Sequence, residues 1–275
     1  MPHPRIAVCS WSLRPESPDE LIEAMKRLDI HSVQLALRPL LENPAVWRGS
    51  IDALAAAGIR TISGMMGMAG EDYSTLESIA ATGGVRPDST WPRNQDLARR
   101  IAALAADAGI GLVTFHAGFL PEDVNDPERA VLLDRLQNIA SIFAECEIQI
   151  ALETGQETAS ILAAALDSLS ASNLGVNFDP ANMILYGKGD PVCALRDLAP
   201  SVRQIHIKDA LPAAMPGIWG EEVPVGMGAV DWDEFFRIAV RITPPVNFVI
   251  EREAGATRER DIAAARDLIM KLMGA

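Results

Sequence analysis

The sequence contains few of the residues on which several classes of protein depend. Among its 275 residues there are only three cysteines, Cys9, Cys146 and Cys193, and aromatic residues make up 5% of the chain. Three scattered cysteines are too few for a disulfide framework or a zinc cluster, and an odd number is typical of a reducing compartment. So few aromatic side chains also disfavour a surface on which single-stranded bases stack.

Positive charge is scarce as well, because 24 lysines and arginines stand against 37 acidic residues and give a formal net charge of -13. Such a surface repels a phosphate backbone and offers no basic face to an anionic membrane, so we expect neither nucleic acid nor a membrane as a partner. No apolar run reaches the ~18 residues of a membrane span. The first residues, MPHPRIAVCSWSL, do not resemble a signal peptide. We therefore expect a cytoplasmic protein.

What the sequence does contain is a regular alternation of short β-branched runs and alanine- and leucine-rich amphipathic stretches. The runs predict strands at 6–13, 32–37, 60–66, 111–117, 148–153, 174–178, 202–208 and 247–251. The amphipathic stretches predict helices near 18–28, 44–57, 91–108, 126–146, 157–170, 191–199, 232–242 and 257–273. Eight strand–helix pairs predict an α/β fold, a (β/α)8 TIM barrel that forms one domain over residues 1–275. The alternative is a doubly wound open sheet, but the turn after the first strand, SWSLR, lacks the glycines that such a sheet normally has there.

Polar residues occupy the ends of four consecutive predicted strands, and the carboxyl ends of its strands are where a barrel of this kind places its active site. Side chains of a strand alternate between its two faces. Isoleucine, valine, leucine and phenylalanine at alternate positions are expected to face the helices, which turns the residues between them toward the barrel interior. The inward residues at these four strand ends are Glu153, Asp179, His206 and Glu251.

Three carboxylates in a partly desolvated space raise one another's pKa unless a cation lies between them. Carboxylate oxygens and one imidazole suit Mn²⁺, Mg²⁺, Co²⁺ or Zn²⁺, and the absence of cysteine from the set argues against a structural zinc site. A single strand-end glutamate more often caps a helix or forms a salt bridge, and a single strand histidine is more often a hydrogen-bonded core residue. Here, however, the polar side chains face the barrel interior on four consecutive strands. This favours one divalent metal ion held by Glu153, Asp179, His206 and Glu251.

The segments that carry these residues are ALETG, NFDPANMILYG, QIHIKDA and VIERE, and VPVGMGAVDW lies between the last two. In combination they resemble the xylose isomerase-like TIM-barrel superfamily, the sugar phosphate isomerase/epimerase group. The resemblance runs over nearly the whole chain and is strongest from about Leu112 to Glu253. It implies that the four residues hold one divalent metal ion, and that Glu153 and Glu251 are the catalytic acid/base groups on either side of the substrate.

The resemblance implies a metal-dependent isomerase or epimerase acting on a sugar or a polyol-derived ketone. One carboxylate removes a proton beside a carbonyl, the metal stabilises the enediolate, and the other carboxylate returns the proton. The same site suits a lyase similar to the inosose and dehydroshikimate dehydratases of this superfamily. A DNA-repair endonuclease needs several more histidines than the four present, and a non-catalytic sugar-binding barrel is a further alternative. The oligomeric state stays open, since many family members are homodimers or homotetramers.

Five further residues are candidates for contact with the substrate: His116, Asn182, Lys208, Trp11 and Trp219. The family often has a polar side chain at the position of His116, although a structural histidine paired with a carboxylate is an equal alternative. For Lys208, an ion pair with Glu251 or Asp209 is favoured over a contact with substrate. Asp209 itself is expected either to orient a loop or to hold the ring of the neighbouring strand histidine.

Asn182 is a departure from the family, because related ketose epimerases often carry histidine three residues after the aspartate. An amide can bind a hydroxyl but cannot titrate, which leaves the substrate and the reaction open. Trp11 and Trp219 are expected either to form an apolar wall for a sugar ring or to pack structurally. Gly226 and Gly228 are expected to serve the geometry of a loop rather than to bind phosphate.

Overall fold

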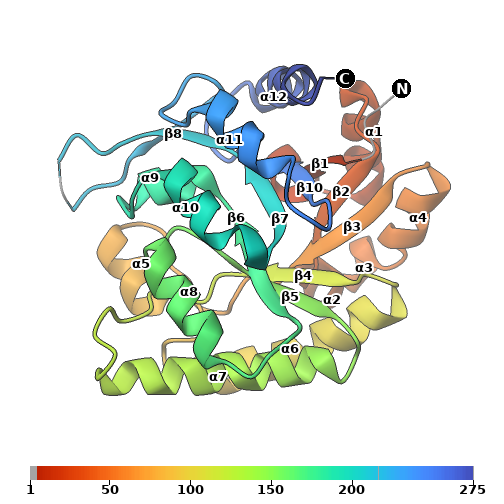
Figure 1. Ribbon diagram of the computed structural model, residues 1–275. Helices are drawn as coiled ribbons and strands as arrows, with labels where there is room; N and C mark the ends of the chain where they lie inside the picture. Colours follow the sequence, from red (N-terminus) through yellow and green to blue (C-terminus); the bar gives the residue numbers. More distant parts are fainter. Residues whose placement is uncertain (1–4, 216, 275) are drawn as a thin grey trace.

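A computed structural model describes residues 5–215 and 217–274 of the chain. Eight parallel strands close into a barrel in the order β1-β10-β7-β6-β5-β4-β3-β2, with helices around its outside (Figure 1). The barrel strands are β1 (Ile6–Cys9), β2 (Ser32–Ala36), β3 (Arg60–Met65), β4 (Leu112–Phe115), β5 (Gln149–Glu153), β6 (Leu174–Phe178), β7 (Val202–Ile207) and β10 (Asn247–Ile250). The predicted single-domain (β/α)8 barrel is confirmed.

The helices follow the strands as expected, with several short additions. Their bounds are α1 (Pro18–Leu28), α2 (Arg38–Glu42), α3 (Pro44–Trp47), α4 (Ser50–Ala56), α5 (Leu76–Thr82), α6 (Trp91–Asp107), α7 (Pro127–Ala144), α8 (Ala159–Ser168), α9 (Pro180–Leu185), α10 (Pro191–Leu198), α11 (Trp232–Ala239) and α12 (Arg258–Leu272), together with the 3₁₀ turns η1 (Ser10–Leu13) and η2 (Ala199–Ser201). Among the described residues, no helix is long and apolar enough to cross a membrane.

Two sequence predictions differ from the structure, and some elements were not predicted. The first strand ends at Cys9 rather than at residue 13, because the chain turns into η1 and Ser10 Oγ accepts a hydrogen bond from the backbone N–H of Ala36. The helix expected at 44–57 is divided, since Gly49 has a φ of 78° and separates α3 from α4. The short helix α9 and the hairpin of β8 (Asp209–Leu211) and β9 (Glu221–Val223) were not predicted.

The alternation of side chains along the strands is confirmed. Apolar residues at alternate positions, such as Val176, Ile205 and Phe248, belong to the large core cluster between the strands and the helices. The positions between them face the interior, where Ala7, Cys9 and Val249 form a small separate cluster. Because neighbouring strands are parallel, their carboxyl ends meet at one mouth of the barrel, which is where the polar strand ends gather.

Candidate active site

The four predicted strand-end residues lie together at this mouth. Glu153 is the last residue of β5, Asp179 follows β6, His206 lies in β7 and Glu251 follows β10. One potential ligand atom from each of them lies within 4.8 Å of those of the other three, and all four side chains are buried. The strands therefore bring together three carboxylates and an imidazole that are separated by tens of residues in the sequence.

The segment after β5 and the start of α9 lock Asp179 in place. The side chain of Asp179 caps α9, with Oδ1 accepting from the backbone N–H of Asn182 at 2.9 Å, and Thr154 Oγ1 accepts from the backbone N–H of Asp179 at 2.8 Å. Gly155 has a φ of 131°, and a Cβ there would lie 2.3 Å from the Cβ of Asn182. Glycine is required at this point because the two segments pack against each other without space for a side chain.

Glu153 accepts hydrogen bonds from two amide side chains. Asn182 Nδ2 donates to Oε1 at 3.0 Å and Asn177 Nδ2 donates to Oε2 at 3.2 Å, while His116 Nε2 lies 3.6 Å from Oε1. Burial by itself would raise the pKa of Glu153, but His116 and His206 outweigh it and lower the pKa below its usual value. Glu153 is therefore held as a carboxylate in a site with almost no solvent.

Glu251 is held equally firmly from two sides. Trp11 Nε1 donates to Oε1 at 2.6 Å and Lys208 Nζ donates to Oε2 at 3.0 Å. Burial opposes ionisation here too, but Lys208 and His206 together hold the pKa of Glu251 well below its usual range. Both glutamates thus start in the form that can accept a proton.

Two buried atoms in the centre of the cluster have no hydrogen-bond partner, His206 Nδ1 and Asp179 Oδ2. Nδ1 lies 3.5 Å from Glu153 Oε1, 3.7 Å from Asp179 Oδ2 and 3.3 Å from Glu251 Oε2. Burial, only partly offset by Lys208, raises the pKa of Asp179 to about 6. Unsatisfied buried oxygen and imidazole nitrogen atoms that face one another among carboxylates are the donor set that a divalent cation requires, so the residues fit a metal ion.

Lys208 is surrounded by carboxylates. Its Nζ lies 3.0 Å from Glu251, 2.8 Å from Glu253, 3.9 Å from Asp179 and 4.0 Å from Glu222. Of the two ion-pair partners expected for it, Glu251 is correct and Asp209 is not. The ammonium group supplies positive charge next to the cluster, which lowers the cost of burying three carboxylates.

Asp209 instead holds the loop that follows the β8–β9 hairpin. Its carboxylate accepts hydrogen bonds from the backbone N–H groups of Ala210, Gly226, Gly228 and Val230 and from the indole N–H of Trp232. A Cβ on Gly228 would lie 2.1 Å from Asp209 Oδ1, and Gly226 has a φ of 87°. This arrangement agrees with the expectation that Asp209 orients a loop. It also agrees with the expectation that Gly226 and Gly228 serve the geometry of that loop.

A cavity of about 730 Å³ opens above the cluster. All five residues predicted to contact the substrate line it: Trp11, His116, Asn182, Lys208 and Trp219. Trp219 packs edge-on against Tyr186, with ring centroids 4.8 Å apart, so these two aromatic rings lie side by side in the lining of the cavity. Trp11 makes a polar contact that was not expected, since its indole N–H donates to Glu251.

Sequence reasoning missed several residues that also line this cavity: Arg38, Glu42, Glu71, Tyr73, Tyr186, Glu222 and Glu253. Tyr186 lies in the NFDPANMILYG segment and Glu253 in VIERE, so their nearness to Asp179 and Glu251 in the sequence was an available signal. Glu71 and Tyr73 belong to the long segment after β3, which has no periodic pattern to place it.

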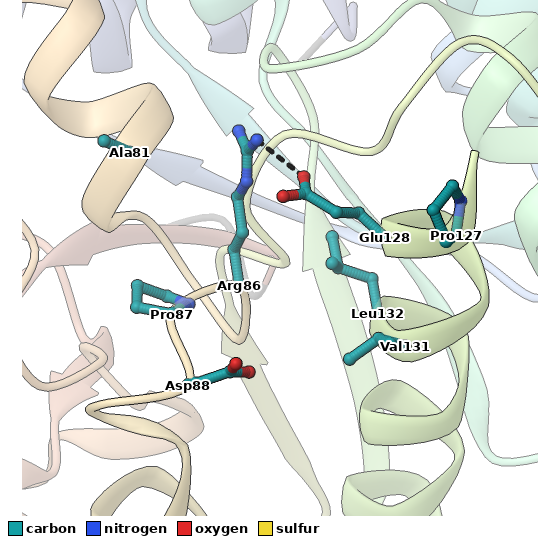
Figure 2. A pocket seen from close by; sticks show the side chains of 8 residues that line it. All are labelled: Ala81, Arg86, Pro87, Asp88, Pro127, Glu128, Val131 and Leu132. Carbon is teal, nitrogen blue, oxygen red and sulfur yellow. Dashed lines mark hydrogen bonds and ion pairs between the residues drawn. The ribbon is translucent and has the colours of Figure 1, made fainter.

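A second cavity, of about 460 Å³, lies outside the barrel between the segment before α6 and the start of α7 (Figure 2). Arg86 Nη2 donates to Glu128 Oε2 at 2.7 Å across it. Asp88 lies on its edge and pairs with Arg135. Each charged group that lines this cavity therefore already has an ion-pair partner, and none of the lining residues belongs to the carboxylate–histidine cluster.

One buried acid near the site, Glu157, gives a pH prediction. Burial raises its pKa from 4.5 to about 8, with Lys188 opposing the shift weakly. The pKa of Glu157 is therefore higher in the folded protein than in the unfolded chain. Such a carboxyl group contributes to stability at a pH below its pKa in the unfolded chain, and this contribution is lost as the pH rises through about 8. We expect Glu157→Gln to increase the free energy of unfolding relative to wild type, and to do so by on the order of 2–4 kcal/mol more at pH 9 than at pH 5. Urea unfolding of wild type and variant at the two pH values measures this difference. The matched control is Glu145→Gln, at an exposed glutamate. An effect of Glu157→Gln that is equal at pH 5 and pH 9 would contradict the prediction.

The chain belongs to the Xylose isomerase-like TIM barrel family, whose profile matches residues 22–272. A solved xylose isomerase domain protein from Planctomyces limnophilus is 32% identical over 98% of this chain and 97% of that one, with a TM-score of 0.87. No curated protein matches the sequence significantly.

Two more distant structures share the fold with this chain. The probable 3-DHS dehydratase AsbF from Bacillus anthracis is 18% identical, with 97% and 98% of the two chains covered and a TM-score of 0.72. D-Psicose 3-epimerase from Clostridium cellulolyticum H10, solved with D-tagatose, is 14% identical, with 98% and 99% covered and a TM-score of 0.73. A probable dehydratase and an epimerase therefore have this same fold.

Proposed function

We propose that this protein is a divalent-metal-dependent isomerase or epimerase that acts on a sugar or a similar polyol-derived ketone. The observation that carries the proposal is the buried cluster of Glu153, Asp179, His206 and Glu251, in which two facing atoms lack any hydrogen-bond partner. Removal of a proton beside a carbonyl needs a base near the carbon and positive charge near the oxygen. The floor of the 730 Å³ cavity supplies residues for both.

The four residues of the cluster would hold the metal ion. When bound, the ion polarises the substrate carbonyl and stabilises the negative charge that develops as the adjacent carbon loses its proton. Glu153 and Glu251 are both ionised at the outset, so either of them can accept that proton. Asn182 and Trp11 hold the two carboxylates in place, and the same side chains line the cavity where substrate hydroxyls would lie.

The reaction type is distinguished by isotope exchange. The protein is incubated in D₂O with Mn²⁺ and a panel of ketoses, aldoses and inososes, and products are followed by NMR and mass spectrometry. Deuterium on the carbon next to the carbonyl, without loss of water, is the expected result for an isomerase or epimerase. Loss of one water with the same metal requirement would favour the lyase alternative. No exchange with any member of the panel, with metal bound, would overturn both.

The charges around the cavity indicate an uncharged substrate. Among the described residues that line it outside the carboxylate–histidine cluster, Arg38 and Lys208 are the cations, against four glutamates, Glu42, Glu71, Glu222 and Glu253. Arg38 already donates to Glu42 and to the carbonyl oxygen of Met68, and Lys208 to Glu251 and Glu253. A phosphate or carboxylate on the substrate would meet negative charge without a free partner, which costs several kcal/mol.

We therefore expect kcat/KM for a free ketose to exceed that for its phosphate ester by about 100-fold or more, because like charges would be brought together in a partly desolvated cavity. Steady-state kinetics with both forms of each active sugar measure the ratio. Glu42→Gln releases Arg38 and should narrow the difference, whereas the exposed Glu128→Gln should leave it unchanged. Equal or better turnover of the phosphorylated form by the wild type would contradict the expectation.

A further inference from the structure

The barrel interior beneath the carboxylate cluster contains a layer of polar side chains. Its members are Gln34 on β2, Ser63 on β3, Thr114 on β4, Asn177 on β6 and Gln204 on β7, and each is fully buried. Barrels of this kind usually fill the interior with branched apolar residues. Burying an amide or a hydroxyl costs free energy unless its hydrogen bonds are formed. Each donor in this layer therefore needs an acceptor, which makes it possible to assign which group donates and which accepts.

One branch of this layer ends on His206, and its polarity follows from the sulfur of Met65. A thioether can only accept, so the hydroxyl of Thr114 donates to Met65 Sδ, at 3.0 Å. The Thr114 oxygen then accepts from Gln34 Nε2 at 2.7 Å. This fixes the side-chain amide of Gln34 with its oxygen toward the ring of His206, 2.7 Å from Nε2.

The other branch ends on Glu153 and does not compete for this role. Ser63 Oγ donates to Gln204 Oε1 at 2.6 Å, and Gln204 Nε2 donates to Asn177 Oδ1 at 3.1 Å. Asn177 Nδ2 is then a donor, with Glu153 Oε2 as its acceptor at 3.2 Å. The same nitrogen lies 3.1 Å from His206 Nε2, but that contact is longer than the one to Gln34 and, with Asn177 oriented by Gln204, it would join two donors.

We infer that Gln34 is a positioning residue that keeps the ring proton of His206 on Nε2, so that the lone pair of Nδ1 faces the carboxylate cluster. This inference rests on the proposed function, in which His206 is a metal ligand. A metal-bound imidazole is neutral, with one nitrogen on the ion and the other acting as a hydrogen-bond donor, and the partner of that donor selects the tautomer. His206 Nδ1 has no hydrogen-bond partner of its own, which leaves it available to a cation.

A glutamine serves this purpose here better than the carboxylate that often lies behind a metal-binding histidine. The site already contains three buried carboxylates around one histidine. A fourth negative charge inside the barrel would add repulsion and a further desolvation cost. The side-chain oxygen of Gln34 accepts the ring proton without adding charge. Cys9 Sγ, 3.5 Å from the same oxygen, adds a weak donor that keeps it in place.

The test uses the purified full-length protein, freed of metal and titrated with Zn²⁺ by calorimetry. Gln34→Met keeps the size of the side chain but removes the acceptor, and it should weaken Zn²⁺ binding about 10- to 100-fold, as other partners of ligating histidines do. Gln34→Glu restores an acceptor opposite Nε2 and should bring the affinity back to within about 5-fold of wild type. Gln95→Met, which makes the same change at a glutamine that binds Asn138 outside the barrel interior, should leave the affinity unchanged.

A second readout reports the tautomer directly. Two-bond ¹H–¹⁵N NMR of histidine-labelled, Zn²⁺-bound protein should show the His206 ring protonated at Nε2 in the wild type, with the signal assigned by its loss in His206→Asn. Tight Zn²⁺ binding that is unchanged in Gln34→Met, or a ring protonated at Nδ1, would overturn this inference and leave the proposed function standing. A wild-type protein that binds no Zn²⁺, Mn²⁺, Co²⁺ or Mg²⁺ would instead overturn the metal site itself.

Discussion

Glu251→Gln is expected to lower turnover by about 10³-fold or more while the barrel stays folded. The side chain is a proposed acid/base group and a proposed metal ligand, and acid/base catalysis alone contributes about 10²–10⁴-fold. An amide cannot accept the substrate proton, and it is a weaker ligand than a carboxylate for a hard divalent ion. The measurement is the rate of deuterium exchange into the best substrate of the panel, at saturating Mn²⁺.

The cost of this substitution to folding should be much smaller than its cost to activity. The glutamine retains an oxygen that can accept from Lys208 at the position of Oε2, although its NH₂ group then faces the donor on Trp11. One unfavourable buried contact costs about 1–3 kcal/mol. Urea unfolding followed by circular dichroism separates this effect from the loss of turnover.

Two comparisons make the Glu251 result specific. Glu128→Gln removes a carboxylate from the exposed ion pair with Arg86 in the outer cavity (Figure 2) and should retain full activity. Calorimetry with Mn²⁺ should show weaker binding in Glu251→Gln and unchanged binding in Glu128→Gln. If Glu251→Gln kept more than about a tenth of wild-type exchange, Glu251 would not be an acid/base group in the reaction.

Asp209→Ala is expected to be the most destabilising substitution outside the apolar core, by on the order of 3–5 kcal/mol. The carboxylate is fully buried and accepts five hydrogen bonds, four from backbone N–H groups and one from Trp232. Removing it leaves the donors at Ala210, Gly226, Gly228 and Val230 without an acceptor in a closely packed loop. Unpaired buried donors carry the full desolvation cost.

The matched control is Asp190→Ala. Asp190 is also an aspartate that binds a backbone N–H, that of Cys193 at the start of α10, but it is exposed and makes a single cap. Loss of such a cap costs about 1 kcal/mol. Urea midpoints of the two variants measure the difference in stability. An Asp209→Ala protein no less stable than Asp190→Ala would show that other contacts hold the loop.

Much of the site could be predicted because two rules act on the sequence directly. Strand side chains alternate with a period of two, so an isoleucine on each side of His206 indicates which way the histidine faces. Parallel strands in a closed barrel end at one mouth, so polar residues at successive strand ends must meet. These rules need no knowledge of distant contacts, and they are sufficient to bring Glu153, Asp179 and Glu251 to the same place.

Two partners of these residues, Trp11 and Gln34, could not be predicted, because they lie far away in the sequence. Trp11 and Glu251 are 240 residues apart, and Gln34 and His206 are 172 residues apart. A tryptophan near a strand end suggests an apolar wall, and only the closure of β1 against β10 shows that its N–H binds a carboxylate. Lys208 likewise has a choice of nearby acids, and the orientation of Asp209 toward its loop settles that choice in favour of Glu251.

The sequence by itself determined the fold class, the mouth at which chemistry is expected and the four residues gathered there, since local periodicity and strand order are sufficient for all three. Only the tertiary structure decided how each of these groups is charged and held. Burial, hydrogen bonding and neighbouring charge depend on atoms brought together across the barrel, and they set the ionisation of Glu153 and Glu251 and the free nitrogen of His206.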